Sequence, residues 1–186
     1  LISPARSAPV CFIFGLGFGI WGYLNRTVEA ALEPLLNVMQ TLPHFSYLVP
    51  VMVLFGVGDH AGAVATIIFA TPPMIRLTIL GLRKISPDIV DSGLMSGCSK
   101  FQLLFRVLIP TARTDILIGV NQVIMQCLAM TTIAAFIGAR GLGFNLKVAL
   151  NSLEIGKASE IGLCVVLIAV ILDKYSLAWA NKQKDY

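Results

Sequence analysis

The segment SPDIVDSGLMSGCSKFQLLFRVLIP, residues 86–110, carries the helix signals around which this chain is organised. Ser86 is an N-cap residue, Pro87 suits the first turn of a helix, and Asp88 would face the positive end of the helix dipole. Further along, Ser99-Lys100-Phe101-Gln102 forms a capping box, in which the serine and the glutamine cap each other's backbone. The segment therefore predicts two short helices rather than a plain connecting loop.

The second of these helices is predicted to be amphipathic and to end at Pro110, because proline cannot continue an interior helical turn. Gly93 and Gly97 precede it, and glycine lets two backbones approach closely. Such a pair of helices can fit a groove on a partner protein or rest on lipid headgroups, and the spacing favours neither. The apolar stripe, at i, i+3, i+4 and i+7, consists of Phe101, Leu104, Phe105 and Leu108.

Long apolar runs flank this insertion. The chain has 186 residues, of which 56% are hydrophobic and 13% charged, and its mean hydropathy of +0.82 is too high for a soluble domain. About 20 apolar residues are needed for a helix to cross a bilayer. We predict an all-α, polytopic transmembrane helical bundle that forms a single membrane domain over residues 1–186, with an insertion at about 81–114 between spans three and four. The five expected spans cover roughly residues 8–24, 42–58, 61–80, 115–137 and 159–179. Because the sequence starts at Leu1 rather than Met, we expect it to be incomplete at its N-terminus.

Basic residues predict the orientation of the spans, since loops rich in Lys and Arg stay in the cytoplasm. The insertion and the C-terminal tail should therefore be cytoplasmic, and the N-terminus and the 138–158 loop should lie outside. The net charge of +4 is scattered between the spans, with no basic face that would indicate nucleic acid. The residues behind this assignment are Arg83, Lys84, Lys100, Arg106, Arg113, Lys182 and Lys184.

Two sets of residues inside the spans are candidates for a translocation pathway. Pro72 and Pro73 remove two backbone donors from the third span, so a kink is expected there beside protein or a water-lined cavity. Asn121 and Gln122 place amides in the fourth span, where burial without partners is costly. These amides can contact a solute or hydrogen-bond between helices, and the sequence leaves both readings open.

The sequence offers no catalytic chemistry. No G-x4-G-K-[ST] phosphate loop occurs, no G-x-S-x-G nucleophile motif is present, and neither His44 nor His60 belongs to a catalytic pattern. The four cysteines lack metal-ligand spacing, so neither a metal nor another cofactor is expected on this chain. The GLGFG run at 15–19 lacks the βαβ context of a dinucleotide loop and is interpreted as a helix-packing face.

The insertion resembles the EAA loop of ABC importer permeases, whose pattern is E-A-A-x3-G-x9-I-x-L-P. The glycine, the nine-residue spacing and the proline match, and the remaining positions differ mildly in chemistry. In that family the loop docks into the ATPase, so the resemblance implies an ATPase-coupling role for these residues. They are Asp91, Ser92, Gly93, Gly97, Val107, Ile109 and Pro110.

The resemblance extends along nearly the whole chain to permeases of the glycine betaine/proline branch. It implies an inner-membrane permease subunit of an ATP-driven importer for a small osmoprotectant, with selection made mainly by an external component. The implied partners are a second permease copy, a dimer of cytoplasmic ATPase subunits that uses ATP and Mg, and an extracytoplasmic substrate-binding protein. The alternative is an ATP-independent secondary transporter or channel, which should display an intramembrane ion site or an internal repeat. The passages that carry the resemblance are 19–25, 39–43, 47–50, 72–78 and 119–122.

Overall fold

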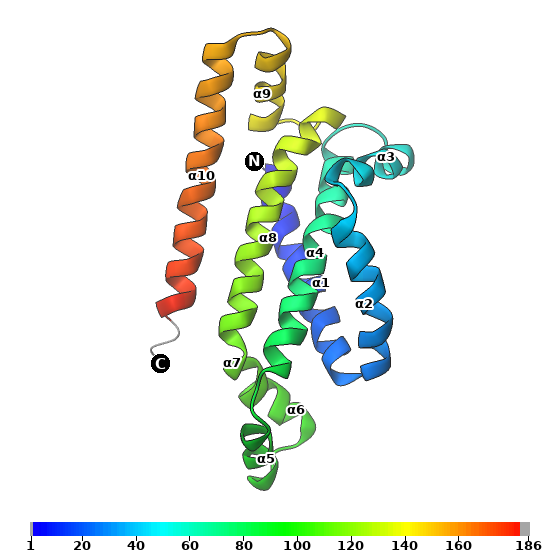
Figure 1. The fold of residues 1–186 in the computed structure, drawn as a ribbon, viewed down its shortest axis with the longest axis vertical. Coiled ribbons are helices and arrows are strands. Elements are labelled where there is room, and N and C mark those ends of the chain that lie inside the picture. The colour runs from blue at the N-terminus through cyan, green and yellow to red at the C-terminus, as the bar shows by residue number, and fades with distance from the viewer. Residues whose placement is uncertain (1, 183–186) are drawn as a thin grey trace.

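The computed structural model describes residues 2–182, and all regular structure in this range is helical (Figure 1). The expected all-α fold class is thereby confirmed. The long helices are α1 (Ile2–Leu24), α2 (Arg26–Thr41), α3 (His44–Phe55), α4 (Asp59–Arg83), α8 (Arg113–Ala134) and α10 (Ile155–Lys182). The short elements are α5 (Pro87–Met95), α6 (Lys100–Leu103), a π-helix (Leu104–Leu108), α7 (Ile109–Thr111), a 3₁₀ turn (Ala135–Ile137) and α9 (Leu142–Asn151).

Four described helices are long and apolar enough to cross a membrane: α1, α4, α8 with its 3₁₀ extension, and α10. They correspond to the expected spans 8–24, 61–80, 115–137 and 159–179. A fifth crossing is possible if α2 and α3, which meet at 101°, are counted as one broken span. Residues 2–182 therefore contain four or five candidate spans, which agrees with the expected number of about five.

The second expected span, 42–58, has a different form from the prediction. Helix α3 is only 12 residues long, and the preceding amphipathic helix α2 was not anticipated. Asn25 caps α2 by accepting a hydrogen bond from the backbone N–H of Thr27 at 3.1 Å. At the other end, Leu42 is extended because it precedes Pro43, and a residue before proline is driven out of the helical region. The chain bends there instead of continuing as one apolar helix.

The proline pair does not interrupt the helix of the third span. Helix α4 is continuous from Asp59 to Arg83 through Pro72 and Pro73. Met74 and Thr78, one turn further on, are completely buried. Contacts of α4 with both α1 and α8 are the most extensive in the bundle, and this packing holds the helix together despite two missing backbone donors.

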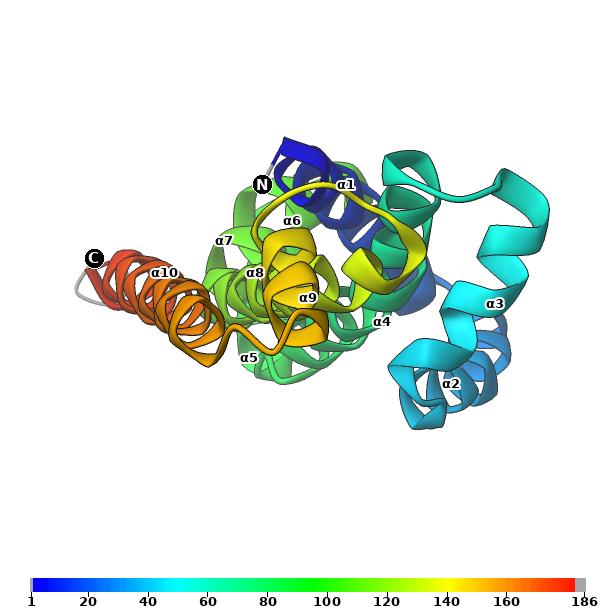
Figure 2. The same cartoon turned by 90° about the horizontal axis from the view of Figure 1, so that it is seen from above.

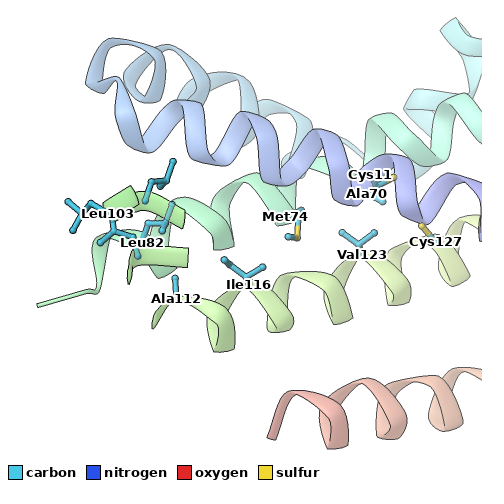
Figure 3. Close-up of a cluster of buried hydrophobic side chains, with 11 residues drawn as sticks. Cys11, Ala70, Met74, Leu82, Leu103, Ala112, Ile116, Val123 and Cys127 are labelled. Carbon is cyan, nitrogen blue, oxygen red and sulfur yellow. The ribbon is translucent and has the colours of Figure 1, made fainter. Parts of the chain in front are cut away.

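Glycines on both neighbours let α4 occupy the centre of the bundle. A Cβ atom added at Gly15 would lie 2.5 Å from the side chain of Met74, and one at Gly19 would lie 2.6 Å from that of Thr78. On the opposite side, a Cβ at Gly119 of α8 would lie 2.8 Å from the sulfur of Met74. The 15–19 run is thus a helix-packing face, as predicted, and Figure 3 shows Met74 within the buried cluster between these helices.

The remaining helices flank this three-helix centre. Seen from above, α10 lies on one side of α1, α4 and α8, and α2 with α3 lies on the other (Figure 2). The hairpin α5–α7 and the end of α10 point towards one end of the molecule, whereas α9 and the start of α1 lie towards the opposite end (Figure 1). The predicted sidedness requires this grouping of the ends, and which end is cytoplasmic stays a prediction. Of the two tail lysines, Lys182 ends α10 and Lys184 lies outside the described residues.

Candidate functional site

The hairpin between α4 and α8 begins both of its helices where the caps predicted. Ser86 accepts a hydrogen bond from the N–H of Asp88 at 3.3 Å, with Pro87 in the first turn of α5. At α6, the N–H of Gln102 donates to Ser99 Oγ at 3.3 Å, and the N–H of Ser99 donates to Gln102 Oε1 at 2.9 Å. The capping box is therefore complete, and α5 and α6 are separate helices joined by a turn.

Two glycines shape this hairpin in different ways. Gly93 is buried where α5 meets α6, and a Cβ atom there would lie 2.5 Å from Leu103 Cδ1 and 3.7 Å from Val107. Gly97 adopts φ +76° in the turn, a left-handed conformation that most residues avoid, and nothing lies within 4 Å of its Cβ position. The first glycine allows close packing, and the second allows the reversal of the chain.

Pro110 does not end the second helix of the hairpin, which corrects the sequence-based expectation. The helical path runs from α6 through the wide π-turn Leu104–Leu108 into α7, with Pro110 in the first turn of α7. The N–H of Ile109 reaches back to the carbonyl of Leu104, five residues earlier. Proline is tolerated in the first turn of a helical element, and the path continues to Ala112.

The predicted apolar stripe divides between two environments. Leu104 and Leu108 are buried in the main core, together with Leu103. Phe101 and Phe105 instead face outwards, with 72% and 49% of their surface exposed and ring centroids 4.5 Å apart. The distal part of the hairpin also exposes Leu94 and Met95, the latter to 90%. These four exposed residues, Leu94, Met95, Phe101 and Phe105, are called the tip residues below.

The remaining residues of the EAA-like pattern are distributed over the same hairpin. Asp91 and Ser92 are exposed on α5, and Val107 and Ile109 are half-buried. At the base, Lys84 Nζ lies 2.9 Å from Asp115 Oδ1, and a Cβ at Gly81 would lie 2.7 Å from Asp115 Cβ. The hairpin is therefore anchored at the point where α4 and α8 meet, so a displacement of the hairpin would act directly on both helices.

Polar side chains join α2 to α4 along one seam. Arg83 forms an ion pair with Glu29, and its Nε donates to Glu29 Oε1 at 2.9 Å. Two turns further into the span, Arg76 Nη2 donates to Asn37 Oδ1 at 2.6 Å. Helices α2 and α4 run antiparallel. The step of two turns from Arg83 back to Arg76 on α4 therefore matches the step of two turns from Glu29 to Asn37 on α2.

A cavity of about 410 Å³ opens beside this seam, between α2, α3, α4 and α8. Its volume lies within the range of roughly 300–1,000 Å³ that is typical of small-molecule sites. Two of the predicted pathway residues, Pro73 and Gln122, are brought together in its wall. The lining consists of Gln40, His44, Phe69, Pro73, Arg76, Leu77, Gln122 and Gln126.

The other two predicted pathway residues lie elsewhere. Pro72 is fully buried and borders a separate apolar cavity that α1 also lines. The amide nitrogen of Asn121 donates to Asp173 Oδ1 of α10 at 3.0 Å, and the hydroxyl of Ser176 donates to the amide oxygen. Asn121 thus takes the interhelical role that the sequence left open.

The sequence-based choice of pathway residues missed Arg76, which lines the cavity. The signal that could have identified it is the presence of an arginine within an apolar span.

The described residues show no grouping of three or more His, Cys, Asp or Glu side chains that could hold a metal ion. The four cysteines are free thiols, and only Cys11 and Cys127 are buried, with Cys98 half-buried and Cys164 exposed on α10. Two of the four cysteines therefore belong to the interior of the bundle.

Residues 12–178 match the model of a protein family described as "Binding-protein-dependent transport system inner membrane component". The chain is 60% identical over 180 residues to the trimethylamine N-oxide transport system permease protein TmoV of Pelagibacter ubique, covering 97% of this chain and 25% of that protein. It is 44% identical over 170 residues to the glycine betaine/proline betaine transport system permease protein ProW of Escherichia coli, covering 90% and 48%. In fold, it resembles an inward-facing structure of the MetNI methionine ABC transporter, with a TM-score of 0.83, 19% identity and coverage of 98% and 91%. The chain thus spans about a quarter of the length of TmoV and about half of the length of ProW.

Proposed function

Because this chain belongs to the family of binding-protein-dependent transport system inner membrane components, we propose that it is the permease part of an ATP-driven ABC importer. The family match confirms the resemblance predicted from the sequence. The observation that carries the proposal is the capped hairpin, which projects from the joint of α4 and α8 and exposes its tip residues. The relatives are named as permease proteins, as expected of a transport subunit rather than an enzyme.

We propose that the tip residues dock into a cytoplasmic ATPase subunit. Exposed large apolar side chains at the end of a rigid hairpin suit a groove on another protein, because burying them removes apolar surface from water. The anchor at Lys84 and Asp115 would transmit a movement of the ATPase to α4 and α8, which line the cavity. The further partners in this proposal are a second permease copy and an extracytoplasmic substrate-binding protein, in the inner membrane of a bacterium.

The proposed substrate class is a small dipolar solute with a fully methylated nitrogen and an acceptor oxygen. Trimethylamine N-oxide and the betaines share these two groups and differ in whether the oxygen belongs to an N-oxide or to a carboxylate. The high identity to a trimethylamine N-oxide permease supports the N-oxide as the first solute to test. Glycine betaine comes second, whereas proline, included in the sequence-based expectation, has weaker support.

Uptake into proteoliposomes tests this function. The full-length permease, its ATPase and its binding protein are reconstituted together, and labelled trimethylamine N-oxide, glycine betaine and proline are supplied with ATP, without ATP, or with a non-hydrolysable analogue. We expect accumulation of a methylated solute only with hydrolysable ATP. Accumulation without ATP would instead favour the secondary transporter. A secondary transporter could use Asp173, a carboxylate within α10, as an ion site. In this structure, however, Asp173 accepts a hydrogen bond from Asn121.

The sidedness of the hairpin can be tested by labelling single cysteines. In a variant with Cys98 and Cys164 replaced by alanine, Met95→Cys places a 90% exposed thiol on the hairpin. The matched variant Leu153→Cys places one in the loop at the opposite end, where Leu153 is 83% exposed. A membrane-impermeant maleimide should label Met95→Cys only from the cytoplasmic side and Leu153→Cys only from the outside. Labelling of Met95→Cys from the outside would contradict the docking model.

A further inference from the structure

Arg76 is a cation inside a membrane span. It lies seven residues before Arg83, at the end of α4, which places it about 10 Å into the span at 1.5 Å per residue. Ionisable residues at such positions are costly and rare, and they usually serve a binding or transport role. The common structural alternative is that the side chain bends back to the headgroup region.

The contacts of Arg76 argue against that alternative. Its Nη2 donates to Asn37 Oδ1 at 2.6 Å, both residues being exposed in this single chain, and Asn37 lies two turns further from the cytoplasmic end of α2 than Glu29. Glu29 is itself engaged by Arg83. Within residues 2–182, no carboxylate forms an ion pair with Arg76. Its charge is therefore held at depth by a neutral amide, and since a guanidinium has five N–H donors, others remain available.

The cavity around Arg76 offers donors and apolar surface but no carboxylate. Gln40, Gln122 and Gln126 supply amides, and the ring of His44 packs against Phe69 with centroids 4.2 Å apart. The carboxylates of Glu29 and Glu33 line a neighbouring cavity closer to the cytoplasmic end, which also borders Arg76. A simple cation would be repelled by Arg76, whereas a dipolar solute can direct its oxygen to the guanidinium and its methyl groups to the aromatic rings.

We propose that Arg76 binds the acceptor oxygen of the transported solute within the membrane, with the methylated nitrogen towards Phe69 and His44. Asn37 is a positioning residue that keeps the guanidinium at this depth. This inference rests on the proposed function, because it names the recognition chemistry of the same pathway. It commits to a solute that carries an N-oxide or carboxylate oxygen and excludes one that has only the methylated cation.

Binding is measured on the detergent-purified complex of full-length permease and ATPase, without the binding protein, by saturation-transfer NMR. The probes are trimethylamine N-oxide, glycine betaine and tetramethylammonium, which has the methyl groups but no acceptor oxygen. Arg76→Gln should weaken binding of at least one oxygen-bearing probe by about tenfold, since a hydrogen bond to a charged group is lost. It should not weaken any tetramethylammonium signal and should strengthen one, because the repulsion between the guanidinium and this cation is removed. The probe that loses binding identifies whether the N-oxide or the carboxylate is the ligand.

Arg140→Gln is the matched control, because Arg140 lies in an outer loop and is exposed. It should bind both oxygen-bearing probes as the wild type does. Arg76→Lys keeps the charge without the planar fork, so an intermediate loss is expected, and it replaces Arg76→Gln if that variant does not elute as a folded complex. Unchanged binding of both oxygen-bearing probes by an Arg76 variant would overturn the inference. Failure of the proposed function would appear separately, as absence of ATP-driven uptake by the wild type.

Discussion

Gly97→Leu is expected to reduce ATP-driven uptake by about tenfold or more while the ATPase continues to hydrolyse ATP. Gly97 has φ +76°, and a leucine in this left-handed conformation costs about 1–2 kcal/mol. The space around its Cβ position is open, so the new side chain would project outwards between the hairpin and its partner. Both effects disturb the surface that the tip residues present. Uptake and phosphate release, measured in the same proteoliposomes, give the ratio of solute transported to ATP hydrolysed.

Gly97→Asn separates the two effects, because asparagine tolerates the left-handed conformation better than most residues and carries a smaller side chain. It should retain a transport-to-hydrolysis ratio close to that of the wild type. A leucine variant that transports with an unchanged ratio would count against docking of the hairpin. If the leucine variant also fails to co-purify with the ATPase, the defect lies in assembly, which equally supports the hairpin as the docking element.

Gly15→Leu is expected to destabilise the helical bundle, with a fall in melting temperature of about 5 °C or more in detergent. A Cβ at this position would lie 2.5 Å from Met74, whose side chain is completely buried and also meets Gly119 on its other side. Met74 therefore has no room to move, and α1 must separate from α4. Overpacking of this kind costs about 1–3 kcal/mol. Intrinsic fluorescence during a thermal ramp measures the shift.

Gly17→Leu provides the matched control on the same helix. Gly17 lies two residues away, is exposed, and has nothing within 4 Å of its Cβ position. Leucine there should leave the melting temperature unchanged or raise it slightly, because leucine favours the helix more than glycine does. Equal destabilisation by both substitutions would show that α1 tolerates no leucine on either face, and the close α1–α4 contact would then not explain the loss.

The two glycine substitutions test different parts of the molecule. Gly15 belongs to the rigid centre formed by α1, α4 and α8, whereas Gly97 belongs to the hairpin attached to that centre through Lys84 and Asp115. A rigid connection between hairpin and centre is what the proposed coupling requires, because a flexible one would absorb the movement of the ATPase. Leu103, Leu104 and Leu108 of the hairpin are buried in the main core, and this packing supports such a connection.

Much of the fold follows from local features of the sequence. Apolar runs of sufficient length predicted four of the helices that can span the membrane, because the cost of exposing backbone groups to lipid leaves few alternatives to a helix. The caps at Ser86 and Ser99 predicted where α5 and α6 begin, since capping depends on residues within one turn. The EAA-like spacing and the wider resemblance predicted the family, which the comparison with family models confirmed.

Only the tertiary structure decided which face of each helix meets another helix. Asn121 and Gln122 are adjacent in sequence, yet one binds α10 and the other borders the cavity, because consecutive residues on a helix point in directions about 100° apart. The stripe from Phe101 to Leu108 lies on one helical face, yet only Leu104 and Leu108 pack into the core, because the neighbouring helices cover only part of that face. Helix α4 stays intact through its two prolines because packing on both sides outweighs the local signal for a break. Local chemistry thus determined the elements, and the contacts between distant helices determined which side chains became available for function.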